Sequence, residues 1–493
     1  PAVGGRALDV ENLTVSYGTA VALLDVSLSV PAGQLVGIIG PNGSGKSTFA
    51  RLIAGLLRPQ KGTITIDTQH HHGPPVGILF QNPDNQLVAV TVDKEVAFSL
   101  ENTGVPPENM PPIMERALAE FGIAHLANRL TNELSGGEKQ RLALAAIMVL
   151  NPPVLVLDEP DSFLDEPGRK QLHDYLSRLR VRSPNTTIVH ITQYERVARE
   201  YGRLIVFHEG QVVADGGSDT VLADHALCER TAIRVLRSRA GVVSTYDHSS
   251  YVGRSIRALK FADASFGFEE KKMVLQSTSF TLGAGEVVAI VGESGCGKST
   301  AGYLLCGLLK PEEGAIVCEN ISGDTFPVGQ RPGVVAGVFQ VPERQFFLHS
   351  CAHELQYGPG NFDRELTPEK LDSYFELVGL DAEQFSRRDP QSLSGGEKRR
   401  LAFAAALSFA PRFVVFDEPT CGLDAEGVAR FESIVASLRN RGIGTAIITH
   451  DGGVVKRLAD RVIHLEREGK WRSYDGDDFF STGAYSGIVS EPE

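Results

Sequence analysis

GPNGSGKST at residues 40–48 and GESGCGKST at residues 292–300 are two copies of one pattern, Gly-x-x-x-x-Gly-Lys-Ser/Thr. Each follows a short apolar segment, LVGIIG (35–40) or VVAIVG (287–292), whose residues predict a β-strand. Glycines in such a loop let the backbone wrap closely around phosphates, and the helix that follows supplies positive potential. A glycine turn that merely connects strand to helix is the alternative, and two matches argue against it. The stretches therefore predict two phosphate-binding P-loops.

The P-loop pattern assigns roles to individual residues. Lys46 and Lys298 are expected to reach the β- and γ-phosphates, and Ser47 and Ser299 to ligate Mg²⁺. The other predicted nucleotide contacts are Gly40, Asn42, Gly43, Ser44, Gly45 and Thr48 in the first loop, and Gly292, Ser294, Gly295, Cys296, Gly297 and Thr300 in the second. Cys296 is interpreted as a small loop residue.

Two further motifs repeat in the same order. LSGGEKQR (134–141) returns as LSGGEKRR (393–400), and VLVLDEP (154–160) returns as FVVFDEP (413–419). The P-loop lysines lie 252 residues apart, and the serines and aspartates of the other motifs lie 259 apart. Such long spacings indicate two homologous domains, because solenoid repeats recur every ~20–50 residues. We predict domains at 1–225 and 255–493, the second ending in an irregular tail, with a linker at 226–254.

Each copy has the pattern of an α/β fold. Apolar runs without alternation, such as VLVLD (154–158), TTIVHIT (186–192) and GTAIITH (444–450), suit parallel strands that are buried on both faces. The acids at the ends of these strands are candidates for chemistry. Asp158 and Asp417 are expected to hold Mg²⁺ through water, and the neighbouring Glu159 and Glu418 to polarise the attacking water. A solvated strand end is the alternative.

The LSGGE motif has the spacing of a helix-capping box, with Ser135 facing Glu138 and Ser394 facing Glu397. Its glycines expose backbone amides at a helix start, which makes an anion site. An ordinary glycine-rich helix start is the alternative. The predicted nucleotide contacts are Ser135, Gly136, Gly137, Ser394, Gly395 and Gly396.

With these motifs the chain resembles the ABC ATPases over nearly its whole length, twice. The resemblance implies two P-loop NTPase domains, each a mainly parallel sheet with an antiparallel β subdomain and a helical subdomain. It implies ATP and Mg²⁺ as cofactors, and a head-to-tail domain pair in which each P-loop faces the other domain's LSGGE signature. It also implies an aromatic residue stacked on adenine, for which Tyr17 and Phe266 occupy the matching positions. Either could instead be a core aromatic.

The resemblance also identifies Gln81 and Gln340 as glutamines that touch Mg²⁺ and sense a membrane partner. Their surroundings, Gln-x-Pro-Asp/Glu-x-Gln, are similar to the ATPases of energy-coupling-factor importers for vitamins and transition metals. This implies a transmembrane coupling subunit and a substrate-binding membrane subunit as partners. Asp84 and Glu343 could meet arginines of the coupling subunit, or could be solvated turn acids.

The copies differ where the family has a histidine that contacts the γ-phosphate. The second copy has His450, but the first has Gln193, which can donate a hydrogen bond and cannot carry a proton as imidazole does. His190 is not a substitute, because strand alternation turns it away from Gln193. The loop after the DEP motif also differs, although Asp165 and Asp424 align. We therefore predict unequal sites, with faster hydrolysis at the one built on Lys298, Glu418 and His450.

Composition limits the function classes. The 493 residues carry 48 basic and 61 acidic side chains, a net charge of −13, so nucleic acid is not expected as a partner. No apolar run approaches the roughly 18 residues that span a bilayer, and none of the six cysteines has zinc-site spacing. We expect a peripheral protein on the cytoplasmic face of the membrane. The histidines at 70–72 could bind a metal, but an exposed loop is the better interpretation.

The predicted function is ATP hydrolysis that powers an importer. A sugar-type importer ATPase is the nearest alternative, against which the Gln-Asn-Pro-Asp-Asn-Gln segment argues. Twin-cassette translation factors usually have a long charged linker, which is not visible here. Cassette-type DNA-repair ATPases carry zinc cysteine pairs or long coiled coils, and neither is visible.

Overall fold

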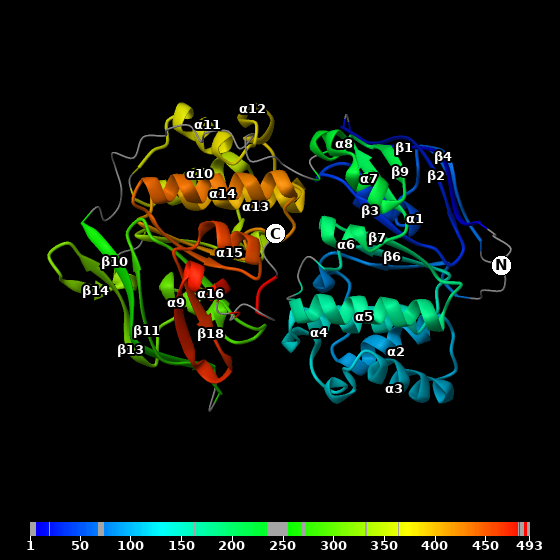
Figure 1. The fold of residues 1–493 in the computed structure, drawn as a ribbon, viewed down its shortest axis with the longest axis horizontal. Coiled ribbons are helices and arrows are strands. Elements are labelled where there is room, and N and C mark those ends of the chain that lie inside the picture. The colour runs from blue at the N-terminus through cyan, green and yellow to red at the C-terminus, as the bar shows by residue number, and fades with distance from the viewer. Residues whose placement is uncertain are drawn as a thin grey trace. The chain divides into compact units, whose positions relative to one another are not determined.

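The chain divides into two compact units, Pro1–Leu236 and Arg237–Glu493, in the computed structural model (Figure 1). The structure describes residues 6–18, 20–67, 73–161, 164, 166–231, 233, 255–268, 272–330, 333–362, 364–481, 483 and 488–490. The predicted limits 1–225 and 255–493 stay a prediction, because most of the linker 226–254 lies outside these residues. The described start of that linker forms helix α8 (His225–Arg230), whose Leu227 and Cys228 are buried in the first unit.

The first unit is built on a six-stranded sheet. In spatial order its strands are β5 (Val76–Leu79), β6 (Val154–Asp158), β7 (Thr187–Ile191), β3 (Leu35–Ile39), β8 (Leu204–His208) and β9 (Gln211–Gly216). The first five strands are parallel, and β9 pairs antiparallel with β8. A second, antiparallel sheet has the order β2 (Ala20–Pro31), β1 (Arg6–Tyr17), β4 (Lys61–Ile66). The expected parallel core with an antiparallel subdomain is therefore confirmed here.

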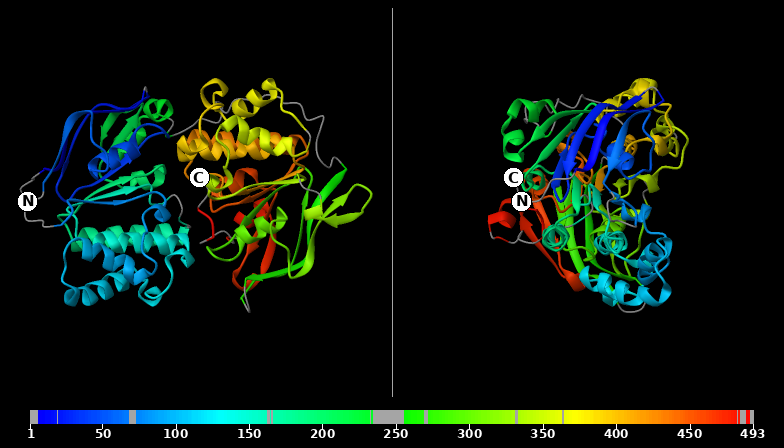
Figure 2. Two further views of the ribbon diagram at one scale, coloured as in Figure 1. Left: turned by 180° about the vertical axis from the view of Figure 1, so that it is seen from behind. Right: turned by 90° about the vertical axis from the view of Figure 1, so that its right-hand side faces the viewer.

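Eight α-helices are described in the first unit. They are α1 (Lys46–Ile53), α2 (Val92–Asn102), α3 (Met110–Glu120), α4 (Gly136–Met148), α5 (Glu166–Arg182), α6 (Glu195–Arg199), α7 (Ser218–Ala223) and α8. Helix α1 packs between the two sheets, where Phe49 and Leu52 are buried. Helices α2, α3 and α4 group together to one side of the parallel sheet (Figures 1 and 2), as the predicted helical subdomain.

The second unit repeats this plan. Its six-stranded sheet has the order β15 (Val335–Val338), β16 (Phe413–Asp417), β17 (Gly444–Ile448), β12 (Val287–Val291), β18 (Arg461–Leu465) and β19 (Trp471–Asp475). Its antiparallel sheet has the order β11 (Lys272–Gly283), β10 (Ile256–Phe268), β13 (Glu313–Asn320), β14 (Thr325–Pro327). Its helices are α9 (Lys298–Leu305), α10 (Cys351–Gly360), α11 (Pro368–Leu377), α12 (Ala382–Phe385), α13 (Gly395–Ser408), α14 (Ala425–Asn440), α15 (Gly452–Leu458) and α16 (Gly476–Ser481).

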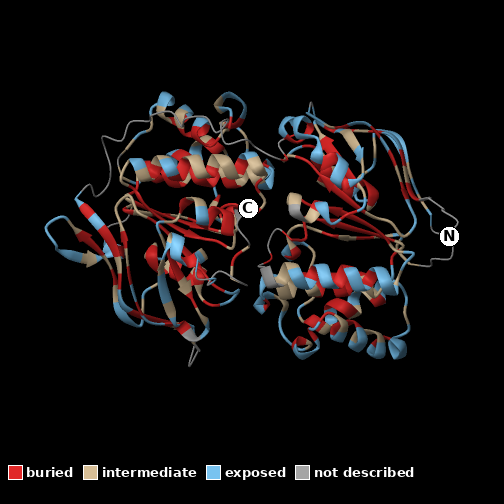
Figure 3. Cartoon of the chain, in the orientation of Figure 1, coloured by how far each residue is buried: buried red, intermediate tan, exposed pale blue. Residues whose placement is uncertain are grey.

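Burial explains the apolar, non-alternating strands. All five residues of β6 and of β16 are buried (Figure 3), because helices cover both faces of a parallel sheet. In the second unit, Phe403, Phe416 and Phe431 pack against one another with ring centroids 5.2–5.5 Å apart. These rings anchor α13 and α14 to β16, so the DEP strand is held between the helix that begins at the signature and the helix that follows the DEP loop. None of the described helices has the length and apolarity to cross a bilayer.

Candidate active sites

The first P-loop joins β3 to α1 and is folded around its own lysine. Lys46 is only 4% exposed, and its Nζ donates to the carbonyl oxygens of Gly40 (2.7 Å) and Pro41 (2.8 Å). Gly45 has φ +101°, and a Cβ there would lie 2.5 Å from the Ala22 carbonyl oxygen. Only glycine fits that turn without strain. The loop thus holds an ammonium group at the start of α1, where phosphates would bind.

The second P-loop joins β12 to α9 in the same way. Lys298 Nζ donates to the carbonyl oxygens of Gly292 (2.8 Å) and Glu293 (2.9 Å), and Gly297 has φ +106°. The structure places the remaining predicted loop residues within these two loops or the first turns of α1 and α9. They are Asn42, Gly43, Ser44, Ser47 and Thr48 in the first unit, and Ser294, Gly295, Cys296, Ser299 and Thr300 in the second.

Each DEP aspartate ends a buried strand beside a P-loop serine. Ser47 Oγ donates to Asp158 Oδ1 at 3.1 Å. Burial raises the pKa of Asp158 to about 6, with a further contribution from the Glu159 charge, and Lys46 opposes the rise. A hydroxyl and a buried carboxylate side by side suit Mg²⁺, which keeps most of its waters and takes few protein ligands. The described residues hold no cluster of three or more histidine, cysteine or acidic side chains that would form an all-protein metal cage.

The second unit has the same arrangement. Burial raises the pKa of Asp417 to about 6, the Glu418 charge adds to the shift, and a hydrogen bond from Ser299 together with Lys298 opposes it. The two aspartates are 5% and 3% exposed. Their negative charge is therefore costly in the absence of a divalent cation, which would compensate it.

The glutamate after each aspartate has a strained backbone. Glu159 has φ +50° and Glu418 has φ +49°, a left-handed conformation that costs a residue with a side chain roughly 1–3 kcal/mol. The backbone N–H of Glu159 donates to Ile191 O, and that of Glu418 to Ile448 O, at 3.0 and 2.8 Å. These bonds hold the turn against the neighbouring strand. Strain of this kind is found where a side chain must be aimed at a reacting group.

Two glutamines hold the Glu159 carboxylate in the first unit. Gln81 Nε2 donates to Glu159 Oε2 at 2.7 Å, and Gln193 Nε2 donates to Glu159 Oε1 at 2.6 Å and to Asn42 Oδ1 at 3.3 Å. Both carboxylate oxygens therefore already accept an amide proton. Each oxygen keeps a second lone-pair direction, so a water molecule could still donate to Glu159 beside these two amides.

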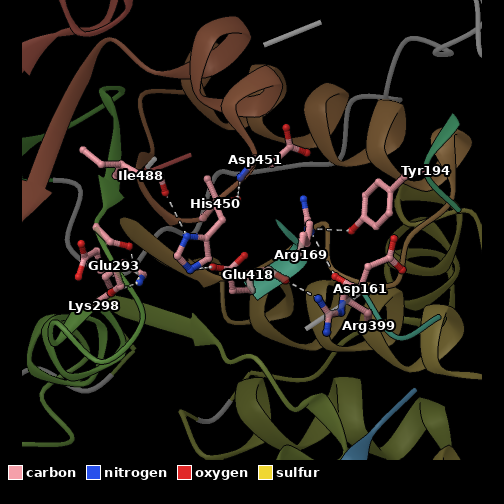
Figure 4. Close-up of polar contacts among 12 residues, drawn as sticks. Asp161, Arg169, Tyr194, Glu293, Lys298, Arg399, Glu418, His450, Asp451 and Ile488 are labelled. Carbon is pink, nitrogen blue, oxygen red and sulfur yellow. Dashed lines mark hydrogen bonds and ion pairs between the residues drawn. The ribbon is translucent and has the colours of Figure 1, made fainter. Parts of the chain in front are cut away.

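A histidine takes the corresponding position in the second unit (Figure 4). His450 Nε2 lies 3.4 Å from Glu418 Oε1, and His450 Nδ1 lies 3.4 Å from the carbonyl oxygen of Ile488. The Ser490 N–H donates to the His450 carbonyl oxygen at 2.8 Å. The segment 488–490 thus contacts both the ring and the backbone of His450. The sequence contained no signal for this contact, because 38 residues separate Ile488 from His450.

His190, which strand alternation predicts to face away from Gln193, is a core residue of β7. It is 2% exposed, its Nδ1 shares a short hydrogen bond with Tyr201 Oη, and burial lowers its pKa to about 3. It is therefore neutral and cannot replace the histidine that the first unit lacks.

The segment after each glutamine is held by a second glutamine. Gln86 Oε1 accepts from Phe80 N at 3.2 Å, and Gln86 Nε2 donates to Ile78 O at 3.1 Å. Gln345 makes the same two bonds across its own loop, at 3.1 and 3.0 Å. The last residue of the Gln-x-Pro-Asp/Glu-x-Gln pattern therefore closes the loop onto its strand.

The comparisons with known proteins agree with this geometry. The family model of ABC transporters matches residues 23–162 and 275–421. The chain belongs to the ABC transporter ATPase family. Members of this family bind ATP with Mg²⁺ and hydrolyse it. The P-loops, buried aspartates and P-loop serines described above fit that chemistry.

Relatives cover most of this ABC ATPase. A candidate ABC transporter ATP-binding protein of Bifidobacterium longum is 31% identical over 92% of the chain, which spans 64% of that relative's length. A counterpart from Methanosarcina acetivorans is 30% identical over 93% of the chain and 88% of its own length. A solved complex of archaeal ribosomal stalk protein aP1 with the ribosome recycling factor aABCE1 covers 96% of the chain and 92% of its own. Its TM-score is 0.62 and its identity 21%, so that likeness shows the fold alone.

The signature helices of this ABC ATPase begin with the expected caps. Ser135 Oγ accepts from the Glu138 N–H, and the Glu138 carboxylate accepts from the Ser135 N–H. Ser394 and Glu397 form the same capping box. The amides of the signature glycines therefore lie in the first turns of α4 and α13.

The structure also shows the surroundings of three other residues that the sequence singled out, Asp84, Asp424 and Cys296. Asp84 is neither isolated nor fully solvated, because its Oδ1 pairs with Lys139 Nζ on α4 at 2.5 Å. Asp424 caps α14 by accepting from the Gly427 N–H at 2.8 Å. Cys296 is 4% exposed, and burial raises the pKa of its thiol. The histidines at 70–72, Asp165 and the side chain of Glu343 lie outside the described residues.

The interpretation of Phe266 as the adenine-stacking residue is wrong in this structure. Phe266 is 8% exposed and belongs to the core between the two sheets of the second unit. Phe268 is 55% exposed, as Tyr17 is 50% exposed in the first unit. Because a base can stack only on an accessible ring face, Phe268 is the better candidate.

The strand registers explain the error. In the second unit, Phe266 pairs with Leu275. The equivalent leucine of the first unit, 252 positions earlier, is Leu23, and Leu23 pairs with Val15. Phe266 therefore corresponds to Val15. By the same registers Phe268 and Tyr17 are the last paired residues of β10 and β1. The similar tripeptides Ser-Phe-Gly and Ser-Tyr-Gly are therefore out of register with each other.

We predict that Phe268→Ala weakens ATP binding without changing stability. Loss of a base–aromatic stack costs ~1–3 kcal/mol, so the Kd for ATP measured by calorimetry should rise about fivefold or more. Tyr17→Ala should behave alike. Phe266→Ala is the contrasting variant, because emptying that core position should lower the free energy of unfolding by roughly 3–5 kcal/mol. Unchanged ATP affinity in Phe268→Ala would remove it as the stacking residue.

We predict that Asp417→Asn stabilises the metal-free protein above pH 6. An acid with a higher pKa in the folded chain binds its proton more tightly there, so its contribution to stability falls as pH rises from 3.8 to about 6. Removing the charge should raise the free energy of unfolding by roughly 1–3 kcal/mol at pH 7.5. In denaturant titrations, the gain over the parent should vanish as the pH approaches 4. Mg²⁺-dependent hydrolysis in the second unit should be lost.

Proposed function

We propose that this ABC ATPase is the ATP-hydrolysing subunit of an energy-coupling-factor type importer for a vitamin or a transition-metal ion. It would act at the cytoplasmic face of the membrane through a separate transmembrane coupling subunit, which in turn works with a substrate-binding membrane subunit. The observation that carries this proposal is an exposed apolar surface beside the glutamine loop of each unit. The loop pattern Gln-x-Pro-Asp/Glu-x-Gln is also held alike in both units.

The docking surface of the second unit consists of Phe347 and Tyr357. These side chains are 60% and 47% exposed, and their rings meet edge to face with centroids 4.7 Å apart. The loop at Phe347 is bonded to α10, because the Glu354 carboxylate accepts from the N–H groups of Phe347 and Leu348 at 2.7 and 2.6 Å. An exposed aromatic pair, with Phe347 on this loop and Tyr357 on α10, is typical of a surface that a partner covers.

The first unit has apolar residues at the same positions. Val88 and Phe98, each 259 residues before its counterpart in the second unit, are 66% and 45% exposed, and Val90 is 65% exposed. Glu95 holds this loop by accepting from the N–H groups of Val88 and Ala89. Repetition of the feature in both units supports an occupant that meets both glutamine loops. We propose that this occupant is a set of apolar cytoplasmic helices of one coupling subunit.

We predict that Phe347→Asp weakens association with the coupling subunit and leaves basal ATP turnover unchanged. A desolvated carboxylate in an apolar contact costs several kcal/mol, so binding should fall by about a hundredfold or more. The measurement is co-purification after co-expression with membrane proteins encoded next to the gene, followed by affinity measurement in detergent. Ile321→Asp is the matched control, because Ile321 is 71% exposed in the turn between β13 and β14.

The same purification tests the function. Recovery of the chain with a transmembrane subunit, and stimulation of its ATPase by that subunit, would support the importer. Recovery with ribosomes would instead support the translation-factor alternative. Recovery of a sugar-importer permease would replace the energy-coupling-factor assignment.

We further propose that the two ATP sites turn over at unequal rates. His450 can accept and donate a proton next to Glu418, whereas Gln193 cannot and already occupies an oxygen of Glu159. Both units keep the glutamate that would polarise the attacking water, so neither site is expected to be inactive.

We predict that Glu418→Gln removes most ATP turnover and Glu159→Gln removes little. The first should lower kcat by about tenfold or more, and the second by about twofold or less. Phosphate release is the assay, and ATP binding to each variant is the control for folding. Equal losses in the two variants would overturn the asymmetry.

A further inference from the structure

Arg399 lies on α13, at the position where LSGGEKRR of the second unit differs from LSGGEKQR of the first. Its side chain is only 5% exposed. Its Nη2 donates to the carbonyl oxygen of Gln340 at 2.9 Å, and its Nη1 donates to the carbonyl oxygen of Glu418 through a short hydrogen bond (Figure 4). One guanidinium therefore joins the signature helix to two loops that carry site residues.

The two carbonyls belong to different elements. Gln340 follows β15, and Glu418 follows β16, in the strained turn described above. A planar guanidinium with fixed donor directions holds both acceptors at one mutual distance. If α13 moves relative to the parallel sheet, the bonds to Arg399 carry the backbones of Gln340 and Glu418 with it or must break.

The first unit provides a natural comparison. Its counterpart, Gln140, donates Nε2 to the Pro160 carbonyl oxygen through a short bond, and its Oε1 is buried without a hydrogen-bond partner among the described residues. Here Gln81 reaches Glu159 directly with its side chain. Among the described contacts, residue 140 makes no bond to the glutamine loop.

The two units also differ in which helix carries the arginine whose positive charge opposes that of the buried aspartate. Burial and the neighbouring glutamate raise the pKa of Asp417, and Lys298 and Arg399 oppose that rise. In the second unit, the opposing arginine is thus carried by the signature helix.

In the first unit, the opposing arginine comes from the P-loop helix. Burial and Glu159 raise the pKa of Asp158, and Lys46 and Arg51 oppose the rise. Arg51 is an exposed residue of α1, and the equivalent position of α9, 252 residues on, is Tyr303. The aspartate of the first unit therefore has its second cation on an element fixed to the sheet, next to the loop that binds phosphate.

We propose that Arg399 is a positioning residue that makes the placement of Gln340 and Glu418 depend on the position of the signature helix. In the first unit, Gln140 reaches only the turn after Glu159, through the Pro160 carbonyl, and no described bond joins it to the glutamine loop. The signature helix of that unit is therefore not tied to the glutamine loop and the glutamate turn together. The proposal rests on the assignment of Gln340 and Glu418 to the ATP site of the second unit. It adds a mechanical difference to the chemical difference between His450 and Gln193.

A purely structural cation is the competing explanation, since a buried arginine that satisfies two carbonyls also stabilises the fold. The two explanations differ in kinetics. A structural residue changes the amount of folded protein and its melting temperature. A positioning residue changes kcat of the folded protein while ATP affinity stays the same, because the P-loop and the adenine contacts are untouched.

The experiment uses the full chain in a Glu159→Gln parent, so that the remaining turnover comes from the second unit. Arg399→Gln should lower kcat about tenfold, with KM and the Kd for ATP within about twofold of the parent. Arg399→Lys keeps the charge and one donor direction, so it should recover part of the loss. Lys310→Gln removes an exposed lysine of the same unit and should change none of these quantities.

The reciprocal variant keeps the proposal testable if Arg399→Gln does not fold. Gln140→Arg in a Glu418→Gln parent should raise the kcat of the first unit by about twofold or more, because the new guanidinium can reach the glutamine loop. An unchanged kcat in that variant would overturn the proposal. So would a normal kcat per folded molecule in Arg399→Gln, or a loss confined to KM.

The two parent variants, Glu159→Gln and Glu418→Gln, distinguish a failure of this proposal from a failure of the site assignment. If the Glu159→Gln parent has no turnover while the Glu418→Gln parent retains it, the assignment of the faster site fails. In that case the Arg399 variants are compared for ATP-dependent hydrogen exchange of residues 341–345. Slower exchange on ATP binding in the parent but not in Arg399→Gln supports the link, and equal slowing in both contradicts it.

Discussion

Two adjacent carboxylates at the end of a buried strand create the electrostatic problem around which each unit is built. Asp158, Glu159 and Asp417 are buried, and the Glu418 side chain is 15% exposed, at the ends of strands whose residues are all buried. The P-loop lysine and a serine hydroxyl offset part of this negative charge in each unit, and two glutamine amides do so in the first. A magnesium ion would compensate the negative charge that remains. The burial that forms the core therefore also makes the site favour a bound cation.

The two units solve this problem with the same backbone and different side chains. The strand order of the six-stranded sheet, the P-loop geometry, the strained glutamate and the capped signature helix agree between them. Two of the differences lie in residues that touch the glutamate or its turn, namely Gln193 against His450 and Gln140 against Arg399. A fused chain can keep such differences, because each copy mutates independently.

Much of the fold and of the phosphate site could be predicted from local pattern. A P-loop can be recognised from nine consecutive residues, and a capping box from four. The role of Phe266 could not be predicted in this way, because it depends on how far β10 runs before it leaves the sheet. Neither the contact of Ile488 with His450 nor the bonds of Arg399 had a local signal, since they join residues 19 to 59 positions apart.

The sequence by itself determined that the chain holds two cassettes and where each P-loop lies, and it predicts which residues would bind phosphate and metal. These features rest on short-range backbone requirements, which only a few residue types can meet. The tertiary structure alone decided which aromatic ring is accessible to a base, which atoms of Glu159 are already occupied, and which helix carries the second cation of each unit. Those properties depend on packing between distant segments, where burial and hydrogen-bond geometry, rather than residue type, determine what a side chain can do.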